Sequence, residues 1–111
     1  ITLKLLIAII QERDRKAVTD ALSSSGVFYT KIPRTGGFLR DGNVTLLLGI
    51  EDERLDEALA IIRDNSQARE QYVSVPPPEV LPTPGMIEAP VKVTVGGAVA
   101  FVMDVESFER W

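Results

Sequence analysis

The sequence predicts an α+β fold: a ferredoxin-like (βαβ-βαβ) sandwich, in which an antiparallel sheet carries two helices on one face. The order strand, helix, strand occurs twice between residues 3 and 75. The chain has 111 residues, which suits one domain that covers residues 1–111. The alternative is a doubly wound parallel sheet, but the chain is short for it. Short links between successive strands also favour antiparallel pairing.

The first strand–helix–strand unit covers residues 3–32. Leu3 to Ile10 is rich in leucine and isoleucine, which is typical of a strand covered on both faces. A helix of roughly three turns is predicted from about Asp14, because apolar residues recur there at helical spacing. Gly26 suits the left-handed position after this helix. Val27 to Ile32 predicts a second strand, which Pro33 either ends or confines to an edge of the sheet.

The second unit repeats this order. Asn43 to Ile50 has the character of the first strand, and Glu51 and Asp52 lie where an N-cap acceptor belongs. The apolar residues at helical spacing after them are Leu55, Ala58, Leu59 and Ile62. This helix is predicted to end near Asn65-Ser66, and Arg69 to Val75 predicts a further strand.

Composition limits the functions that the chain can perform. It has no cysteine and no histidine, which excludes disulfides, thiolate metal sites and a histidine base. No P-loop and no nucleophile with an obvious base are present, so an enzyme is the least expected function, and no cofactor or metal is expected. The formal net charge of −4 argues against binding a nucleic-acid polymer. Ile1 to Ile10 is apolar but too short to span a bilayer, so we expect a cytoplasmic protein without membrane insertion.

The C-terminal third begins with a change of composition. Val75 to Pro90 holds six of the seven prolines, which predicts a long surface loop that is either functional or disordered. Val91 to Val95 alternates apolar and polar residues and predicts a strand, which Ala98 to Val102 continues. The last apolar residues predict a final short turn: Val105, Phe108 and Trp111.

Two glycine segments are candidates for ligand binding. In the loop from Arg34 to Gly42, the run Thr35-Gly36-Gly37-Phe38-Leu39-Arg40 combines amides for an anion nest with a hydroxyl, a guanidinium and an aromatic face for stacking a base. A flexible hairpin loop with its aromatic in the core explains the same residues, and spacing alone does not decide. Gly96-Gly97 either leaves room for a ligand or marks a bulge or a close backbone approach, and the structural interpretation is favoured.

A cluster of carboxylates follows the third predicted strand. Its members are Glu51, Asp52, Glu53, Asp56 and Glu57. Paired carboxylates suit acid–base chemistry or a divalent metal. These residues lie in the first turn of the second predicted helix, where the macrodipole favours anions, so helix stabilisation is the favoured interpretation.

Several separated segments together form a family signature. It begins with Thr30-Lys31 and continues with Thr35-Gly36-Gly37-Phe38-Leu39-Arg40 and Gly42-Asn43. Further segments agree: Glu51 to Glu57, Arg69-Glu70-Gln71, Val93-Thr94-Val95-Gly96-Gly97-Ala98 and Phe101-Val102. The chain thereby resembles the PII-like cyclic-di-AMP receptors over nearly its whole length.

This resemblance implies a homotrimer, similar to PII signalling proteins, with ligand sites in clefts between neighbouring subunits. Two loops, here about residues 33–42 and 76–90, are implied to change order when the ligand binds and so to regulate a downstream protein, which the sequence does not identify. The residues that match family positions at or near the ligand are Thr30, Gly37, Phe38, Leu39, Asn43, Gly49, Gly97 and Phe101. Phe38 is implied to stack on an adenine. The Gly37 and Leu39 amides are implied to meet phosphate or base, and Asn43 to hydrogen-bond the adenine edge.

One position departs from the family pattern. Family members carry a ligand-contacting Arg two positions before Thr30, where this chain has Phe28. Losing a charge-assisted contact costs about 1.5–3 kcal/mol. The cations available to compensate are Lys31, Arg34, Arg40 and Arg110, and Phe28 can instead add stacking. Two alternatives therefore stay open: a PII-like receptor for ATP, ADP or another adenine nucleotide, and a trimeric protein-interaction module that binds no nucleotide.

Overall fold

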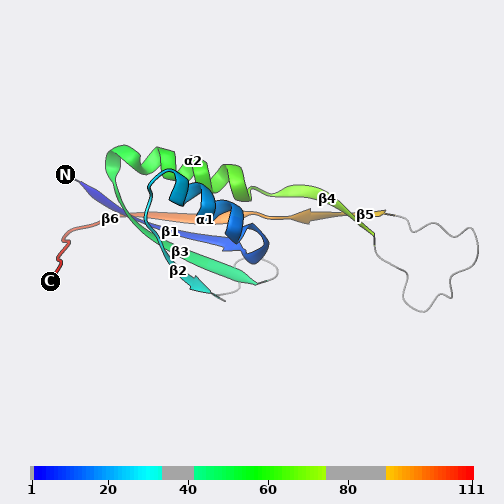
Figure 1. Cartoon of the computed structure of the whole chain (residues 1–111), viewed down its shortest axis with the longest axis horizontal. Coiled ribbons are helices and arrows are strands. Elements are labelled where there is room, and N and C mark those ends of the chain that lie inside the picture. The colour runs from blue at the N-terminus through cyan, green and yellow to red at the C-terminus, as the bar shows by residue number, and fades with distance from the viewer. Residues whose placement is uncertain (1, 34–41, 75–89) are drawn as a thin grey trace, which may run out of the picture.

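The computed structural model describes residues 2–33, 42–74 and 90–111 (Figure 1). In chain order, its elements are β1 (Leu3–Gln11), η1 (Glu12–Asp14), α1 (Arg15–Ser24), β2 (Thr30–Pro33), β3 (Asn43–Glu51), η2 (Asp52–Arg54), α2 (Leu55–Ser66), β4 (Arg69–Ser74), β5 (Pro90–Val95) and β6 (Ala98–Asp104). Here η denotes a single turn of 3₁₀-helix. The end of α2 at Ser66 confirms the boundary that the sequence predicts.

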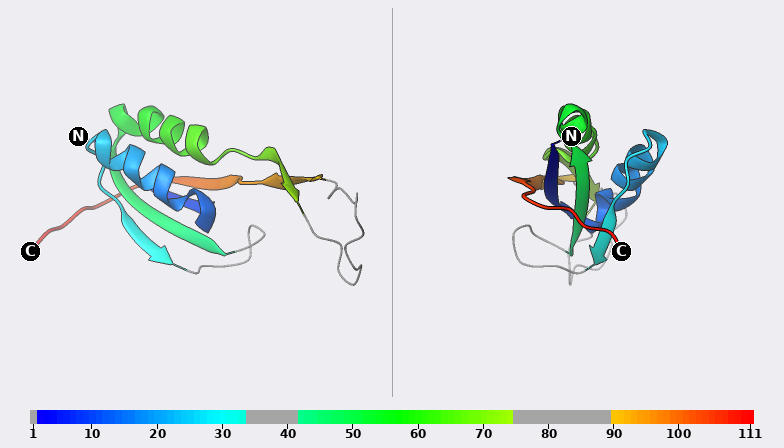
Figure 2. Two further views of the ribbon diagram at one scale, coloured as in Figure 1. Left: turned by 45° about the vertical axis from the view of Figure 1, so that its right-hand side comes forward. Right: turned by 90° about the vertical axis from the view of Figure 1, so that its left-hand side faces the viewer.

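The main sheet has the order β2-β3-β1-β6, and each neighbouring pair of strands is antiparallel. Both helices lie on one side of it (Figures 1 and 2). This arrangement confirms the α+β prediction and is consistent with a ferredoxin-like sandwich. The doubly wound parallel alternative is wrong, because every pair of neighbouring strands in the main sheet is antiparallel.

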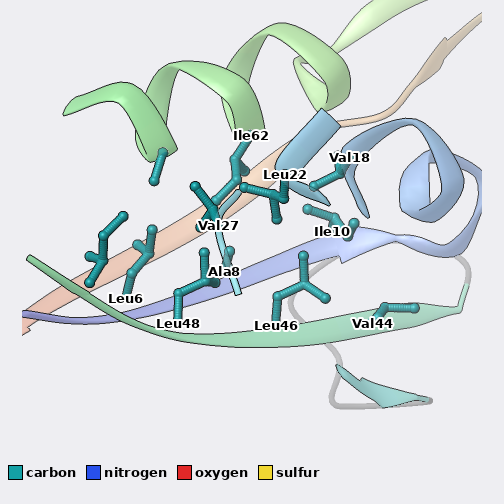
Figure 3. Close-up of a cluster of buried hydrophobic side chains, with 12 residues drawn as sticks. Leu6, Ala8, Ile10, Val18, Leu22, Val27, Val44, Leu46, Leu48 and Ile62 are labelled. Atoms are coloured by element: carbon teal, nitrogen blue, oxygen red, sulfur yellow. The ribbon is translucent and has the colours of Figure 1, made fainter. Parts of the chain in front are cut away.

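The hydrophobic core lies between the helices and one face of the sheet (Figure 3). Alternate residues of β1 and β3 enter it: Leu6, Ala8, Ile10, Val44, Leu46, Leu48 and Ile50. The helices contribute Val18, Leu22, Ala58 and Ile62. Because side chains alternate along a strand, the residues between them, such as Leu5, Ile7 and Leu47, belong to the opposite face. We call this the helix-free face, because neither α1 nor α2 covers it.

The apolar run of β1 predicts a strand that is buried on both faces. The helices bury only one of these faces. Leu5 and Ile7 are half-buried on the helix-free face, whereas Leu6 and Ala8 are fully buried on the helix side. The prediction of a strand buried on both faces is therefore wrong for the single chain at Leu5 and Ile7. The apolar side chains of the helix-free face have no helix to cover them.

The turn between α1 and β2 ends the helix as predicted. Gly26 has a φ of +71°, the left-handed conformation that glycine adopts without strain. The strand predicted over Val27 to Ile32 is shorter, since β2 covers only Thr30–Pro33. Val27 is instead buried in the core, where it packs with the helices. Pro33 ends β2 at an edge of the sheet, which confirms the prediction for this proline.

The acidic residues after β3 lie at the N-terminal end of the second helix. Asp52 and Glu53 lie in η2, and Asp56 and Glu57 lie in the first turn of α2. Glu51 occupies the N-cap position of η2, as predicted, but its side chain makes no capping hydrogen bond. Asp52 lies inside η2 and is not an N-cap, so the prediction is wrong for this residue. The carboxylates remain well placed for the positive end of the α2 dipole.

β4 and β5 form a separate two-stranded ribbon, which we call the arm. The arm projects from the end of the sheet that lies away from both chain termini (Figures 1 and 2). The repeated strand–helix–strand order places the strand at residues 69–75 in the main sheet, and this prediction is wrong. β6 takes that edge position and pairs with β1 from Lys4↔Asp104 to Ile10↔Ala98.

Gly96 and Gly97 connect the arm to β6. Their φ angles are +82° and +105°. A Cβ added to Gly96 would lie 2.8 Å from the carbonyl oxygen of Gln67 and 2.5 Å from Nη1 of Arg69. The Gly97 amide donates a hydrogen bond to the carbonyl oxygen of Ser66. The close backbone approach predicted for this glycine pair is therefore confirmed.

The segment after β6, residues 105–111, contains no helix or strand. Val105 donates its backbone N–H to the carbonyl oxygen of Leu3 at 3.2 Å, but Phe108 and Trp111 are exposed to solvent. The predicted final turn anchored by Phe108 is therefore wrong.

The glycine run of residues 35–40 and the proline-rich stretch up to residue 89 lie outside the described residues, so the loop predictions made for them stay predictions.

We predict that Gly96→Ala lowers the free energy of unfolding by about 1–3 kcal/mol, because the new methyl group meets a backbone carbonyl and the positive φ strains an L-residue. Urea denaturation measures this change. Gly49→Ala is the matched control: no atom lies within 4 Å of its added Cβ. It should leave stability unchanged or raise it slightly, and equal losses for the two variants would contradict the prediction.

Candidate ligand-binding site

Candidate ligand residues from both edges of the sheet share the helix-free face. Cross-strand partners in an antiparallel sheet point to the same face, so the strand register defines rows of side chains. One row runs from Thr30 through Leu47 and Ile7 to Phe101. Thr30 is exposed at one edge, and Phe101 is 43% exposed at the other. With strands about 4.8 Å apart, the two edge residues are roughly 14 Å apart.

A second row lies beside the first on the same face. It contains Gly49 of β3, Leu5 of β1 and Met103 of β6. Gly49 is exposed, and the space where its side chain would lie is open. Together, the two rows form an apolar surface with a gap at Gly49. Thr30 lies at one edge of this surface, and Phe101 and Met103 lie at the other.

Asn43 lies at the other end of β3, where the chain turns. It is 2% exposed and faces Gln11 across the β1–β3 ladder. The Gln11 side-chain oxygen accepts a hydrogen bond from the Gly96 amide at 2.7 Å. The next residue, Glu12, donates its backbone N–H to the carbonyl oxygen of Gly42 at 2.8 Å. The turn after β1 thus holds both the start of β3 and the base of the arm.

The structure therefore divides the predicted ligand residues into groups. Thr30, Gly49 and Phe101 lie on the helix-free face, whereas Asn43 and Gly97 lie at the arm end of the sheet. Arg110 is exposed in the segment after β6, and Lys31 is exposed on β2. Gly37, Phe38 and Leu39 lie outside the described residues, as do Arg34 and Arg40. The sheet thus places three residues that are far apart in the sequence on one face, two of them at its opposite edges.

Sequence reasoning missed the ion pair at the base of the arm. Nη2 of Arg69 lies 2.8 Å from Oδ1 of Asp14, whose side chain is only 4% exposed. The hydrogen bond to Asp14 raises the pKa of Arg69, burial lowers it, and the charge of Asp14 raises it further. The two residues are 55 positions apart, and Asp14 lies in a polar stretch between Arg13 and Arg15, so no local pattern marks it.

The other perturbed charges lie at the opposite end of β1. Lys4 pairs with Asp104, and this hydrogen bond raises the pKa of the lysine. A hydrogen bond with Glu51 raises the pKa of Glu53.

Among the residues that the structure describes, no group of His, Cys, Asp and Glu side chains is placed to hold a metal ion. In the same part of the chain, no helix is long and apolar enough to cross a membrane.

Comparison with known proteins decides the family. A family model described as "Cyclic-di-AMP receptor" matches residues 3–111. The chain belongs to the cyclic-di-AMP receptor family. Both rows of the helix-free face and the whole arm therefore lie within the part of the chain that the family model matches.

A solved structure agrees with this cyclic-di-AMP receptor family fold. It is described as the crystal structure of a functionally unknown protein from Pediococcus pentosaceus ATCC 25745. The two sequences are 41% identical, and the match covers 99% of this chain and 98% of that one with a TM-score of 0.78. The overall fold of this chain is thus similar to that of the solved structure.

We predict that Arg69→Gln lowers the free energy of unfolding by about 1–3 kcal/mol, because it leaves the buried Asp14 carboxylate without its charged partner. Arg63→Gln is the control, since Arg63 pairs with Asp64 on the exposed surface of α2. An exposed pair contributes about 0–1 kcal/mol. Urea denaturation of both variants measures the difference, and an equally small effect of Arg69→Gln would count against the buried pair.

Proposed function

We propose that the chain is a cyclic-di-AMP-binding signal receptor of the PII-like type. The observation that carries this proposal is the family match over residues 3–111. The structure supports it because Thr30, Gly49 and Phe101, which the family resemblance marks as ligand residues, share the helix-free face. A sequence without histidine or cysteine also favours binding over catalysis.

The receptor is proposed to be a homotrimer. A two-layer fold buries one face of its sheet under helices, and the other face needs a partner when it is apolar. On β6, the side chains of Phe101 and Met103, which face the helix-free side, are each 43% exposed. Together with Leu5 and Ile7, they form the kind of apolar surface that other copies of the chain can cover.

The ligand is proposed to bind between subunits. Thr30 lies on edge strand β2 and Phe101 on edge strand β6, with two strands between them. A ligand held by both residues of one chain would have to lie across Leu47 and Ile7, where the trimer buries apolar surface. If β2 of one subunit approaches β6 of the next, the same two residues border one cleft. Their position on opposite edges therefore favours a shared site.

In this cleft, the resemblance assigns the chemistry to particular groups. Phe38 stacks on one adenine, and the Gly37 and Leu39 amides meet phosphate or base. Asn43 hydrogen-bonds an adenine edge. Binding then reorders the two loops, about residues 33–42 and 76–90, and changes which protein partner docks. Such a response requires that the ligand bind one loop arrangement more tightly than the other.

We predict that calorimetry detects binding of cyclic-di-AMP at low micromolar concentration or below. Phe38→Ala should weaken binding by ten-fold or more, because stacking of a base on an aromatic side chain contributes about 1–3 kcal/mol. Tyr72→Ala, which removes an exposed aromatic from the arm, is the control. Absence of binding at tens of micromolar would refute the assignment. Tighter binding of ATP or ADP would support the alternative ligand that Phe28 suggests.

We predict that light scattering finds three copies of the chain per particle. Met103→Lys should give single chains, because it places a charge on the helix-free face at the proposed interface. Ser23→Lys adds the same charge on the exposed surface of α1 and should leave the assembly intact. A monomeric wild-type protein, or an unaffected Met103→Lys variant, would contradict the trimer.

A further inference from the structure

The turn that follows β1 contacts two segments that are far from it in the sequence. The side-chain Oε1 of Gln11 accepts a hydrogen bond at 2.7 Å from the amide of Gly96, which follows β5 at the base of the arm. Glu12 donates its backbone N–H at 2.8 Å to the carbonyl oxygen of Gly42, the residue directly before β3. The turn therefore joins the base of the arm to the start of the strand that carries Asn43.

Gln11 is a polar residue that the fold buries, since only 4% of it is exposed. Leaving the polar atoms of a buried amide unpaired costs free energy, so such groups are hydrogen-bonded. The hydrogen bond from Gly96 fixes the side-chain oxygen of Gln11. Because a side-chain amide is planar, the orientation of its NH₂ group is fixed at the same time. The base of the arm thus holds the Gln11 side chain in one orientation.

Asn43 lies directly beside this side chain. Gln11 and Asn43 are the last pair of the β1–β3 ladder. Opposite residues of an antiparallel pair have Cβ atoms about 4.5–5.5 Å apart, and their side chains point to the same face. Both residues are buried, with exposed fractions of 4% and 2%. In a closely packed environment, the orientation of one side chain restricts the orientation of the other.

The arm has another attachment, which does not involve Asn43. Arg69, the first residue of β4, pairs with the buried carboxylate of Asp14. This ion pair fixes the arm strand that does not lead into β6. Gln11 differs from it because it contacts the arm and also faces a residue that the family resemblance marks for the ligand.

We propose that Gln11 is a positioning residue for ligand recognition: it holds Asn43 in the orientation that hydrogen-bonds an adenine edge, and it ties this orientation to the arm through Gly96. The inference rests on the proposed function, which assigns the adenine edge to Asn43. Because coupling between two sites is reciprocal, a ligand bound at Asn43 also restricts Gln11 and stabilises its hydrogen bond with the base of the arm.

The first test is calorimetric titration of the intact chain with cyclic-di-AMP and with cyclic-di-IMP, whose bases carry an oxygen in place of the 6-amino group. Asparagine pairs with N7 and the 6-amino group of adenine, so the wild type should prefer cyclic-di-AMP. Asn43→Ala and Gln11→Met should each lower this preference by about five-fold or more. The double variant should lower it no further than Asn43→Ala alone, because Gln11 acts through Asn43.

Arg69→Gln is the matched control, because it breaks the other attachment of the arm and leaves Gln11 beside Asn43. The preference of this variant for cyclic-di-AMP should equal that of the wild type within about two-fold. A purely structural role of Gln11 would weaken both dinucleotides equally in Gln11→Met and leave the preference unchanged. That result would overturn the inference, as would additive losses in the double variant.

The second test needs only the wild-type protein, so it decides the matter even if Gln11→Met does not fold. Hydrogen exchange is measured by NMR with and without cyclic-di-AMP. The Gln67 amide, which donates to the carbonyl oxygen of Arg63 at 2.9 Å, controls for general stabilisation. Relative to it, the ligand should slow exchange of the Gly96 amide by about five-fold or more. Equal slowing of the two amides would refute the link to the arm.

The outcomes separate this inference from the proposed function. If the wild type binds neither dinucleotide, the proposed function fails and the inference with it. If Asn43→Ala removes the preference for cyclic-di-AMP but Gln11→Met retains it, only the positioning role is refuted. Equal affinity of the wild type for both dinucleotides, or an unchanged preference in Asn43→Ala, would refute it as well, because Gln11 would then have no adenine contact to position.

Discussion

The antiparallel ladder between β1 and β3 is the interaction on which the main sheet and its two helices are built. It runs without a break from Leu3↔Glu51 to Gln11↔Asn43 at the centre of the sheet. Its alternate side chains form the floor of the core on which both helices pack. The ladder positions β2 on one side and β6 on the other, so its register also decides which residues share a row on the helix-free face. A slip of one residue would exchange the two faces.

Local patterns predicted most of this fold. The 3.6-residue spacing located α2 and its end at Ser66, and Gly26 marked the turn after α1. The placement of β4 failed for a physical reason: alternation reveals a strand but not the strand with which it pairs. The choice between the main sheet and the arm depends on contacts such as Asp14–Arg69, which join residues 55 positions apart. No window of sequence contains both partners of such a contact.

The candidate site was predicted from the family resemblance and not from local patterns. The residues near the ligand came from a resemblance, since spacing alone left the glycine run undecided between a nest and a plain hairpin. The sheet adds that Thr30 and Phe101 lie in one row at opposite edges, a relation that only the register of three ladders reveals. Phe28 looked like a missing cation in the sequence. In the structure, Phe28 is exposed and lines a small hollow together with Gly49. The sequence alone does not show this relation.

The alternation along β1 has a consequence for how such a protein can evolve. Leu6 and Ala8 are buried under the helices, whereas Leu5 and Ile7 line the opposite surface. The residues that form the core and the residues of the helix-free face therefore alternate along the same strand. Substitutions on the helix-free face can therefore change that surface while the core residues between them preserve the fold.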